Sequence, residues 1–371
     1  MMRVLTYHYI RNNGAVLFAE SLLRLLREAG LPVELLNYQA PSMFGVETLK
    51  RLRIRWPDPL FYARRDRTFR AYIARKIPET GCPPIRSRAG LRRSVPAGAS
   101  VLAAMDVWNI NQDWINGHFP SAYWLGDFTE QRRFAFGVSA YRFGPECGEQ
   151  FLPEVSALVR EFEMIAARDA YTYQLMERAG YRGVLVEVPD PTFMLPASEL
   201  GRSEICRQAC LPADRPLIGV AVSRPYRGLK ALLADARQAG YLTVGLGMHC
   251  RFADVQRGDS LDPMQWFNLI EQCEVLITDR FHGTVAAMIH RTPVLCLESV
   301  PLPWTQSKIC SVLDRFDLGI CHQGETLPAG TFESVTAAIR ERFSGNQGDH
   351  EARLCVCRCE LQDAARQMAA R

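Results

Sequence analysis

Short apolar runs alternate with helical patterns along most of the chain, and this alternation restricts it to an α/β fold. The first unit is a strand at 3–7, a turn at Asn12-Asn13-Gly14, a helix whose leucines at 17, 22, 25 and 26 share one face, and a strand at 32–36. A strand–helix–strand unit is typical of parallel sheets. We therefore expect parallel strands covered by helices.

The same rhythm occurs twice. In the first half, further strands are predicted at 100–104, 133–138 and 183–188, and helices at 153–165 and 171–179. A turn-rich stretch at 189–198 suits a connection between domains. Strands are then predicted at 217–222, 242–246, 275–278 and 294–297, and helices at 228–238, 263–271 and 284–290. Because 371 residues exceed the size of a single core, we expect two domains, 1–193 and 194–371.

Composition is that of an ordinary soluble globular protein, with 48% hydrophobic and 23% charged residues, which excludes a disordered or low-complexity chain. No apolar stretch approaches the roughly 20 residues that cross a bilayer. The start, from Met1 to Tyr7, turns polar too early for a signal peptide. These features predict a cytoplasmic protein.

The twelve cysteines are scattered through predicted strands and helices, which favours buried thiols over a disulfide scaffold. Cys355, Cys357 and Cys359 invite a metal interpretation, but they lack the usual C-x-x-C spacing and a second cluster. An amphipathic C-terminal helix explains Cys357 better. Its apolar face would carry Leu354, Cys357, Leu361, Ala364, Ala365 and Met368. We expect no metal site.

Positive charge is concentrated in segment 50–93, which holds fourteen lysines and arginines against three acidic residues. A solvated helical face is the simplest interpretation. Nucleic acid is disfavoured because no recognised binding module surrounds the segment. Contact with an anionic acceptor, or with the inner face of a membrane, is the alternative.

The segment from Val275 to Thr284 predicts a ligand site. An apolar run, typical of a buried parallel strand, ends in Asp279-Arg280-Phe281-His282-Gly283 just before a predicted helix. Ligands bind at the carboxyl ends of strands in open α/β sheets, and a helix N-terminus presents unpaired N–H groups there. Arg280 can hold an anion through two parallel donors, and His282 titrates near neutral pH. The alternative is a helix cap in which Arg280 pairs with a carboxylate and His282 fills the turn.

Other polar residues are expected near strand ends. Arg224 and His249 follow strands at the same edge of the second sheet as Arg280. In the first half, Arg168 lies where a short strand meets a helix start, and the loop with Asn13 and Gly14 precedes a helix N-terminus. That loop lacks G-x-G-x-x-G and so does not predict dinucleotide binding.

Several motifs, in their order along the chain, resemble those of the polysaccharide pyruvyl transferase family. The similar segments are 13–22, Ala167-Arg168-Asp169, Pro189-Asp190-Pro191-Thr192-Phe193, Thr278-Asp279-Arg280-Phe281-His282-Gly283, Arg291-Thr292-Pro293-Val294 and Lys308. Members move the enolpyruvyl unit of phosphoenolpyruvate onto a saccharide as a ketal. The resemblance implies a transferase of two Rossmann-like domains facing a cleft, in a GT-B-like arrangement. It further implies phosphoenolpyruvate as donor, no cofactor, and a saccharide or lipid-linked glycan as acceptor.

For such a donor, cations must neutralise a phosphate and a carboxylate. We expect Arg168 and Arg280 to do so, with help from Arg224 and Lys308. N–H groups of Gly283 and Thr284 would complete the anion cradle.

Ketal formation also needs a proton at the methylene carbon of the donor. His282 is the expected general acid, and His249 is a weaker second choice that otherwise lines the cleft. Asp106, Asp279 and Glu298 are candidates for orienting acceptor hydroxyls, although Asp279 could instead pair with an arginine and Glu298 could simply end its strand.

One segment departs from the family pattern. Members often have a Gly-Ser-Asp-Gln-like turn before Trp-Asn, whereas this chain has Ala103-Ala104-Met105-Asp106-Val107 before Trp108-Asn109. The departure leaves the acceptor half of the site open. A GT-B glycosyltransferase that uses a nucleotide sugar is one alternative function, and a non-catalytic carbohydrate- or nucleic-acid-binding relative is another. Retention of Arg280 and His282 argues against a decayed site.

Overall fold

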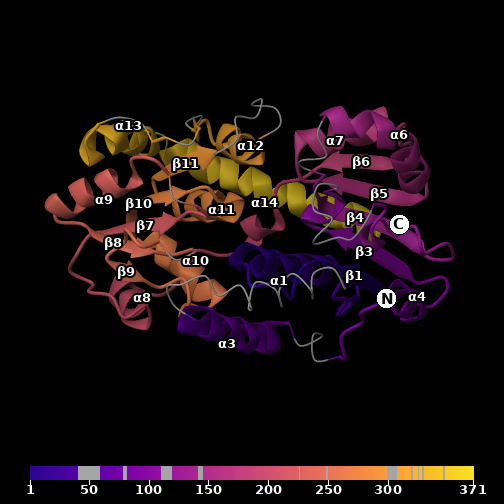
Figure 1. Ribbon diagram of the computed structural model, residues 1–371. Coiled ribbons are helices and arrows are strands. Elements are labelled where there is room, and N and C mark those ends of the chain that lie inside the picture. The colour runs from indigo at the N-terminus through magenta and orange to yellow at the C-terminus, as the bar shows by residue number, and fades with distance from the viewer. Residues whose placement is uncertain are drawn as a thin grey trace.

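The computed structural model describes residues 1–40, 59–77, 82–109, 119–140, 145–224, 226–247, 250–298, 307–318, 321–324, 326–327, 330–345 and 347–371. Over these ranges the chain forms two six-stranded sheets, side by side in Figure 1, with strand orders β2-β1-β3-β4-β5-β6 and β12-β11-β10-β7-β8-β9. Every pairing within them is parallel. The predicted α/β fold of parallel strands is confirmed.

The strands of the first sheet precede residue 193 and those of the second follow it. The first sheet contains β1 (Met2–Leu5), β2 (Val33–Leu35), β3 (Ser100–Ala104), β4 (Arg132–Val138), β5 (Phe162–Ala167) and β6 (Val184–Glu187). The second contains β7 (Leu217–Ala221), β8 (Leu242–Gly245), β9 (Val255–Gln256), β10 (Cys273–Thr278), β11 (Val294–Glu298) and β12 (Cys321–Gln323).

Helices cover both sheets (Figure 1). In the first half they are α1 (Asn13–Glu28), α3 (Pro59–Lys76), α4 (Arg88–Arg93), α6 (Pro145–Val159) and α7 (Ala170–Arg178), with 3-10 turns η2 (Asp106–Trp108), η3 (Ala122–Trp124) and η4 (Pro191–Met194). In the second half they are α8 (Arg202–Gln208), α9 (Leu229–Gln238), α10 (Pro263–Glu271), α11 (Phe281–His290), α12 (Lys308–Arg315), α13 (Phe332–Gly345) and α14 (Gln347–Ala369).

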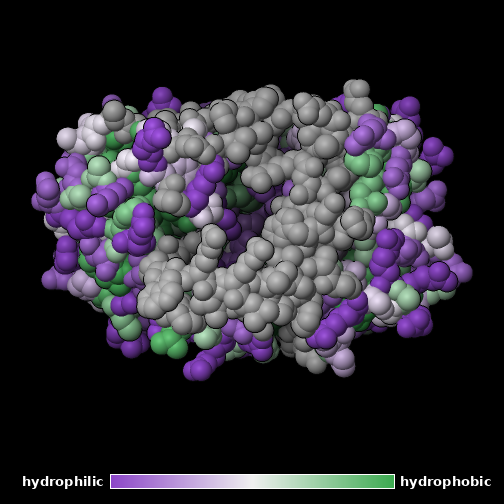
Figure 2. All heavy atoms as spheres, in the orientation of Figure 1, coloured by the Kyte–Doolittle hydropathy of each residue, from purple (hydrophilic) through white to green (hydrophobic). Residues whose placement is uncertain are grey.

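The central strands are buried on both faces, which explains their continuous apolar runs. Val275, Leu276 and Ile277 of β10 have no solvent-exposed surface, and neither do residues 101–104 of β3. Polar side chains can therefore gather only beyond the ends of these central strands. Figure 2 shows a hollow between the two halves of the molecule, with hydrophilic residues visible inside it.

Two predicted helix boundaries are wrong. The helix expected at 153–165 ends at Val159, and Phe162–Ala167 form β5 between β4 and β6. Met164 and Ile165 suit the apolar face of either element, and strand pairing decides between them. The helix expected at 284–290 begins three residues earlier, at Phe281, so His282 lies in its first turn.

The turn-rich stretch at 189–198 runs from β6, the last strand of the first sheet, to α8 of the second half, and it is also packed. Its 3-10 turn η4 contacts α1, α11 and α14, and Pro191, Thr192 and Phe193 are buried. The prolines shape a tight turn there, and the side chains around it fill the centre of the molecule. The stretch therefore connects the two halves, and its 3-10 turn also takes part in the packing between them.

The C-terminal helix α14 has the apolar face predicted for it. Its buried apolar residues are Leu354, Cys357, Leu361, Ala364, Ala365 and Met368, whereas Cys355 and Cys359 are exposed. The helix contacts α1 and η4, which belong to the first half of the chain, so it joins the two halves. Within the ranges given above, no three His, Cys, Asp or Glu residues cluster as metal ligands do.

Part of the basic segment bridges the two halves. From α3, Arg64 pairs with Asp259 at 2.7 Å and Arg75 with Asp262 at 3.2 Å. Residues 50–58 and 78–81 of the segment lie outside the described residues. These two arginines of α3 form ion pairs with the second half of the chain. The predicted solvated helical face therefore applies to only part of α3. No helix in the described part of the chain has the length and apolarity needed to cross a membrane.

Candidate active site

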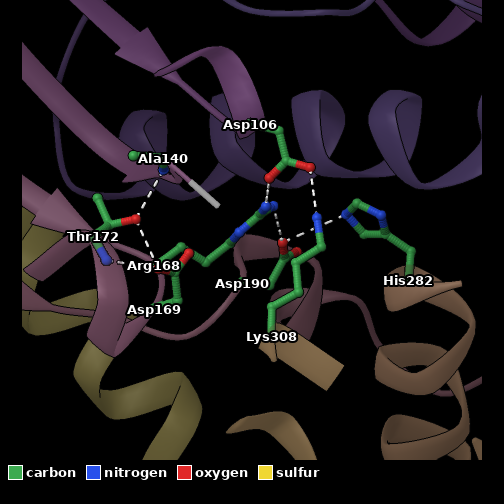
Figure 3. A network of polar contacts seen from close by, with 8 residues as sticks. All are labelled: Asp106, Ala140, Arg168, Asp169, Thr172, Asp190, His282 and Lys308. Carbon is green, nitrogen blue, oxygen red and sulfur yellow. Dashed lines mark hydrogen bonds and ion pairs between the residues drawn. The ribbon is translucent and has the colours of Figure 1, made fainter. Parts of the chain in front are cut away.

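Five charged or titratable side chains meet where the two halves face each other (Figure 3). Arg168 follows β5, and its Nη1 donates to Asp190 Oδ2 at 2.9 Å. Its other terminal nitrogen pairs with Asp106, and Lys308 Nζ lies 2.7 Å from the second Asp106 oxygen. His282 Nε2 lies 3.4 Å from Asp190 Oδ2. We call these residues the interdomain network.

The interdomain network joins the first half to the second. Asp106 and Asp190 come from η2 and η4, whereas His282 and Lys308 come from α11 and α12. Asp106 therefore contacts Arg168 of its own half and Lys308 of the other half. Asp190 contacts Arg168 of its own half and His282 of the other half. The aromatic ring of Phe281 closes one side, since its centroid lies 4.7 Å from the Arg168 guanidinium and 5.3 Å from Lys308 Nζ.

A capping hydrogen bond positions Asp190, and the backbone turn before η2 positions Asp106. Asp190 precedes η4 and accepts a hydrogen bond from the N–H of Thr192 at 2.9 Å. Asp106 begins η2 directly after Met105, whose backbone has φ 79° and ψ −161°. This conformation is essentially restricted to glycine, and a side chain there is strained. The departure of residues 103–109 from the family pattern therefore places a strained methionine beside Asp106.

Burial and neighbouring charges set the protonation of the Asp190–His282 pair. Burial alone would raise the pKa of Asp190, but His282, Arg168 and the Thr192 hydrogen bond lower that pKa well below its ordinary value. Burial lowers the pKa of His282, Asp190 opposes this shift, and Arg168 and Lys308 add to it. In this structure, Asp190 is ionised and the imidazole is neutral at neutral pH.

Arg168 does not offer a free guanidinium to an anion in this structure, contrary to our expectation. Its side chain is 1% exposed and is matched by Asp106 and Asp190. With two cations, two carboxylates and a neutral histidine, the interdomain network carries no net charge. A multiply charged anion needs positive charge from elsewhere.

Arg280 supplies such a charge. It caps α11, its side chain is exposed, and no described residue forms a hydrogen bond or ion pair with its guanidinium. The helix-cap alternative, in which Arg280 pairs with a carboxylate, is therefore wrong for the described residues. The predicted cradle needs one correction, because the N–H of Thr284 bonds to the carbonyl of Arg280 and closes the first helical turn. The N–H groups of residues 281–283 come before this first helical hydrogen bond, so these are the backbone groups that the helix start can offer to an anion.

Glycines allow close approach around this turn. A Cβ atom at Gly283 would lie 2.6 Å from Thr278 Oγ1, and one at Gly14 would lie 2.1 Å from Cγ and Nδ1 of His282. Gly14 belongs to the first turn of α1, not to the loop in which we expected it. Asn13 is buried beside it, and its Oδ1 has no hydrogen-bond partner among the described residues.

Four other residues predicted for the site lie outside the interdomain network or outside the described residues. Arg224 is half-buried, with its guanidinium 5.8 Å from the ring centroid of Tyr226. Asp279 accepts hydrogen bonds from Ser223 and Tyr226, so it anchors the loop after β7 rather than pairing with an arginine. Glu298 ends β11 and accepts a hydrogen bond from Ser307 at 3.0 Å. His249 lies outside the described residues.

Sequence reasoning thus missed Asp190, which it took for part of a connecting turn. A signal was present, because an aspartate between two prolines lies three residues after the carboxyl end of β6. That edge of a parallel sheet is where functional side chains gather.

Comparison with protein families finds that the polysaccharide pyruvyl transferase model matches residues 12–299, which include every member of the interdomain network except Lys308. The chain belongs to this family. It is therefore a transferase of the kind that modifies polysaccharides. Comparison with curated protein sequences finds no match.

Solved structures show the fold of this transferase. A putative UDP-N-acetylglucosamine 2-epimerase from Listeria monocytogenes is 10% identical with a TM-score of 0.54, and the match covers 100% of this chain and 94% of that one. A glycosyltransferase from Rickettsia africae is 10% identical with a TM-score of 0.52, covering 100% and 96%. UGT89C1 of Arabidopsis thaliana, in complex with quercetin, is 12% identical with a TM-score of 0.50, covering 100% and 98%. The predicted GT-B-like arrangement of two Rossmann-like domains is confirmed.

The contact between Gly14 and His282 gives a first prediction. In Gly14→Ala the new methyl group overlaps the imidazole, so His282 or α1 must shift, and we expect a loss of about 1–3 kcal/mol in the free energy of unfolding. Urea unfolding measures this loss. Gly345→Ala is the control, because nothing lies within 4 Å of its Cβ position. Equal stability of the two variants would show that His282 has room to move.

Proposed function

We propose that this transferase moves the enolpyruvyl unit of phosphoenolpyruvate onto two hydroxyl groups of a saccharide or glycoconjugate, forming a ketal and releasing phosphate. Family membership supports the transferase class. The observation that carries the donor assignment is the pairing of the buried Asp190 and His282 next to Arg280, a cation that no described residue neutralises.

The charges of the site suit such a donor. Phosphoenolpyruvate carries a phosphate and a carboxylate close together, so its binding site needs more than one cation. Arg280 and the N–H groups of residues 281–283 provide unmatched positive potential at the start of α11. Lys308 provides a further cation, since its ammonium group can exchange Asp106 for a donor oxygen.

The proposed reaction uses His282 as general acid. Its proton adds to the methylene carbon and leaves the central carbon cationic. One acceptor hydroxyl adds to this carbon and loses its proton, phosphate leaves with the electrons of its C–O bond, and a second hydroxyl adds and loses its proton. Asp190 fixes the imidazole and favours its protonated form.

Asp106 is the carboxylate that we propose for the acceptor hydroxyl. Its side chain is 24% exposed, whereas that of Asp190 is fully buried, so Asp106 is the acid of the interdomain network that a substrate can reach. Once Lys308 turns to the donor, an Asp106 oxygen is free to accept a hydroxyl proton. This role also explains why Asp106 bridges two cations before the donor binds.

The function is tested by incubating the protein with phosphoenolpyruvate and a panel of glycans, lipid-linked sugars and small acceptors. We expect phosphate release together with a mass gain on one acceptor. Thermal unfolding supplies a second measurement, because a ligand that binds only the folded state raises the unfolding temperature. Protection by a nucleotide sugar and none by phosphoenolpyruvate would instead favour the glycosyltransferase alternative.

A further inference from the structure

Helix α3 of the first half carries an arginine to the ligand-binding edge of the second sheet. Arg65 Nη1 donates to the carbonyl of Gly247, just after β8, at 3.2 Å and to that of Gly258, just after β9, at 2.6 Å. Its Nη2 donates to the carbonyl of Arg11, just before α1, at 3.1 Å. Three backbone segments therefore fix the position of this guanidinium.

These contacts hold Arg65 without neutralising it. All three acceptors are neutral carbonyl oxygens, and a guanidinium has five N–H donors. The Nε–H and one Nη2–H of Arg65 have no acceptor in the described part of the chain. By contrast, its neighbour Arg64 pairs directly with Asp259 at 2.7 Å. Arg65 is thus a rigid cation that keeps two donors for a further partner.

The second unmatched cation nearby is Arg280. Arg280 follows β10, and the carbonyls that hold Arg65 Nη1 follow β8 and β9 of the same sheet, where only β7 separates β10 from β8, so both arginines lie at one edge of this sheet. Burial is the main cause that lowers the pKa of Arg65 to about 10; repulsion from Arg280 and Arg11 adds to it, and Tyr62 and Asp259 oppose it. Arg11 is matched by Asp66 at 2.9 Å. Arg65 and Arg280 are not matched in this way by any described carboxylate. Two arginines at one edge of a sheet can hold one phosphoryl group through charge-assisted hydrogen bonds.

This pair of arginines is adjacent to the proposed active site. Arg65 holds the carbonyl of Arg11, and three residues later Gly14 packs against the His282 ring. Arg280 and His282 are two residues apart at the start of α11. A ligand with an anionic group between Arg65 and Arg280 therefore lies beside the general acid.

We propose that Arg65 and Arg280 together grip the phosphoryl group of the donor, so that α3 of the first domain completes a binding site built on the second. The assignment of the donor as phosphoenolpyruvate rests on the proposed function, but the phosphoryl site does not. Arg65 forms this site only while α3 lies against the loops after β8 and β9. Phosphoryl binding therefore also stabilises the contact between the domains.

Isothermal titration calorimetry with three probes tests the site. The probes are inorganic phosphate, phosphoenolpyruvate, and pyruvate, which has the carboxylate but no phosphoryl group. We expect Arg65→Met to weaken phosphate and phosphoenolpyruvate binding about ten- to a hundredfold, the effect of losing a charged hydrogen-bonding partner, and to leave pyruvate binding unchanged. Arg65→Lys, which keeps the charge, should recover part of the loss.

Arg64→Met is the matched control. It removes the adjacent arginine of the same helix together with an ion pair across the same domain contact, so it measures how much binding is lost when this contact is weakened, and that loss should be much smaller than in Arg65→Met. Equal weakening of pyruvate and phosphoenolpyruvate in Arg65→Met would make Arg65 a structural brace and overturn the proposal. Absence of phosphate binding to the unmodified protein would also overturn it.

The outcome separates this inference from the proposed function. If phosphate binds in an Arg65-dependent way but no acceptor gains mass from phosphoenolpyruvate, the phosphoryl site stands and the pyruvyl transfer fails. If transfer occurs and Arg65→Met has an unchanged KM for phosphoenolpyruvate, the transfer stands and the site is wrong.

Discussion

His282→Gln should lower kcat for transfer from phosphoenolpyruvate by about a hundred- to ten-thousandfold, which is the usual contribution of a general acid. Glutamine fills a similar volume next to Gly14 and still offers an N–H to Asp190, but it has no proton to give to a carbon atom. Affinity for the donor should change little, because the anion contacts belong to Arg280 and its neighbours. Steady-state kinetics at saturating acceptor measures kcat and KM separately.

The pH profile of the unmodified enzyme should identify the same group. Only the protonated imidazole is active, so rates fall as the pH rises through the pKa of His282. Burial, Arg168 and Lys308 lower that pKa from 6.5 in the free protein, so kcat/KM should decline on the acid side of 6.5. A bound anion favours the imidazolium, which moves the decline of kcat to higher pH. In His282→Gln, the decline of kcat and of kcat/KM with rising pH should disappear.

A second histidine provides the control for this experiment. His350 on α14 is buried, has a lowered pKa, and lies with its Nε2 2.6 Å from the carbonyl oxygen of Met288. It has no contact with the interdomain network. His350→Gln should keep the kcat and the pH profile of the unmodified enzyme. The acid assignment is wrong if His282→Gln behaves in the same way.

The fold was predictable because each local pattern agrees with the global structure. Short apolar runs such as Val275–Thr278, rich in β-branched residues, favour a strand buried on both faces, and Asp262-Pro263 marks the start of α10, where Asp262 and Gln265 form a capping box. The helix predicted at 153–165 failed because apolar residues near its end fit two periodicities. Only pairing with β4 and β6, which are distant in sequence, decides between them.

The candidate site was predictable only in part. Strand ends identified Arg168, Arg280 and His282, because the carboxyl edge of a parallel sheet is a place that sequence can locate. What sequence could not show is which charges neutralise one another. Arg168 is matched and Arg280 is not, although both follow strands in similar motifs. Arg65 is one of fourteen lysines and arginines in its segment. Among those that the structure describes, it differs from the others through its hydrogen bonds to backbone carbonyls of the second domain, such as that of Gly258, which sequence cannot show.

Arg168→Met should be the most destabilising substitution in the interdomain network. It leaves the Asp190 carboxylate, which is fully buried, without its direct hydrogen-bonding cation. Removing one partner of a buried ion pair typically costs about 3–5 kcal/mol, because the remaining charge is uncompensated. Arg132→Met is the control for loss of an arginine. Its pair with Glu163 is on the surface and 43% exposed on the arginine side, so about 1 kcal/mol or less should be lost.

The same substitution should weaken the downward shift of the His282 pKa. Burial remains its main cause, but one repulsive cation is gone, so the pKa of His282 in Arg168→Met should be higher than in the unmodified protein. A histidine with a lowered folded-state pKa costs stability as the pH falls through 6.5, and a smaller shift costs less. The stability difference between Arg168→Met and the unmodified protein should therefore shrink in acid, as measured by urea unfolding across pH 5 to 8.

Replacing the unpaired Asp190 carboxylate by an amide tests whether its charge causes the loss of stability. In the double variant Arg168→Met, Asp190→Asn, no buried charge remains unpaired, and we expect it to be more stable than Arg168→Met alone. The acid-dependent recovery should vanish with it, because an amide does not draw a proton to His282. Loss of the same free energy in both variants, with the same pH dependence, would show that Arg168 acts through packing on Phe281 rather than through its charge.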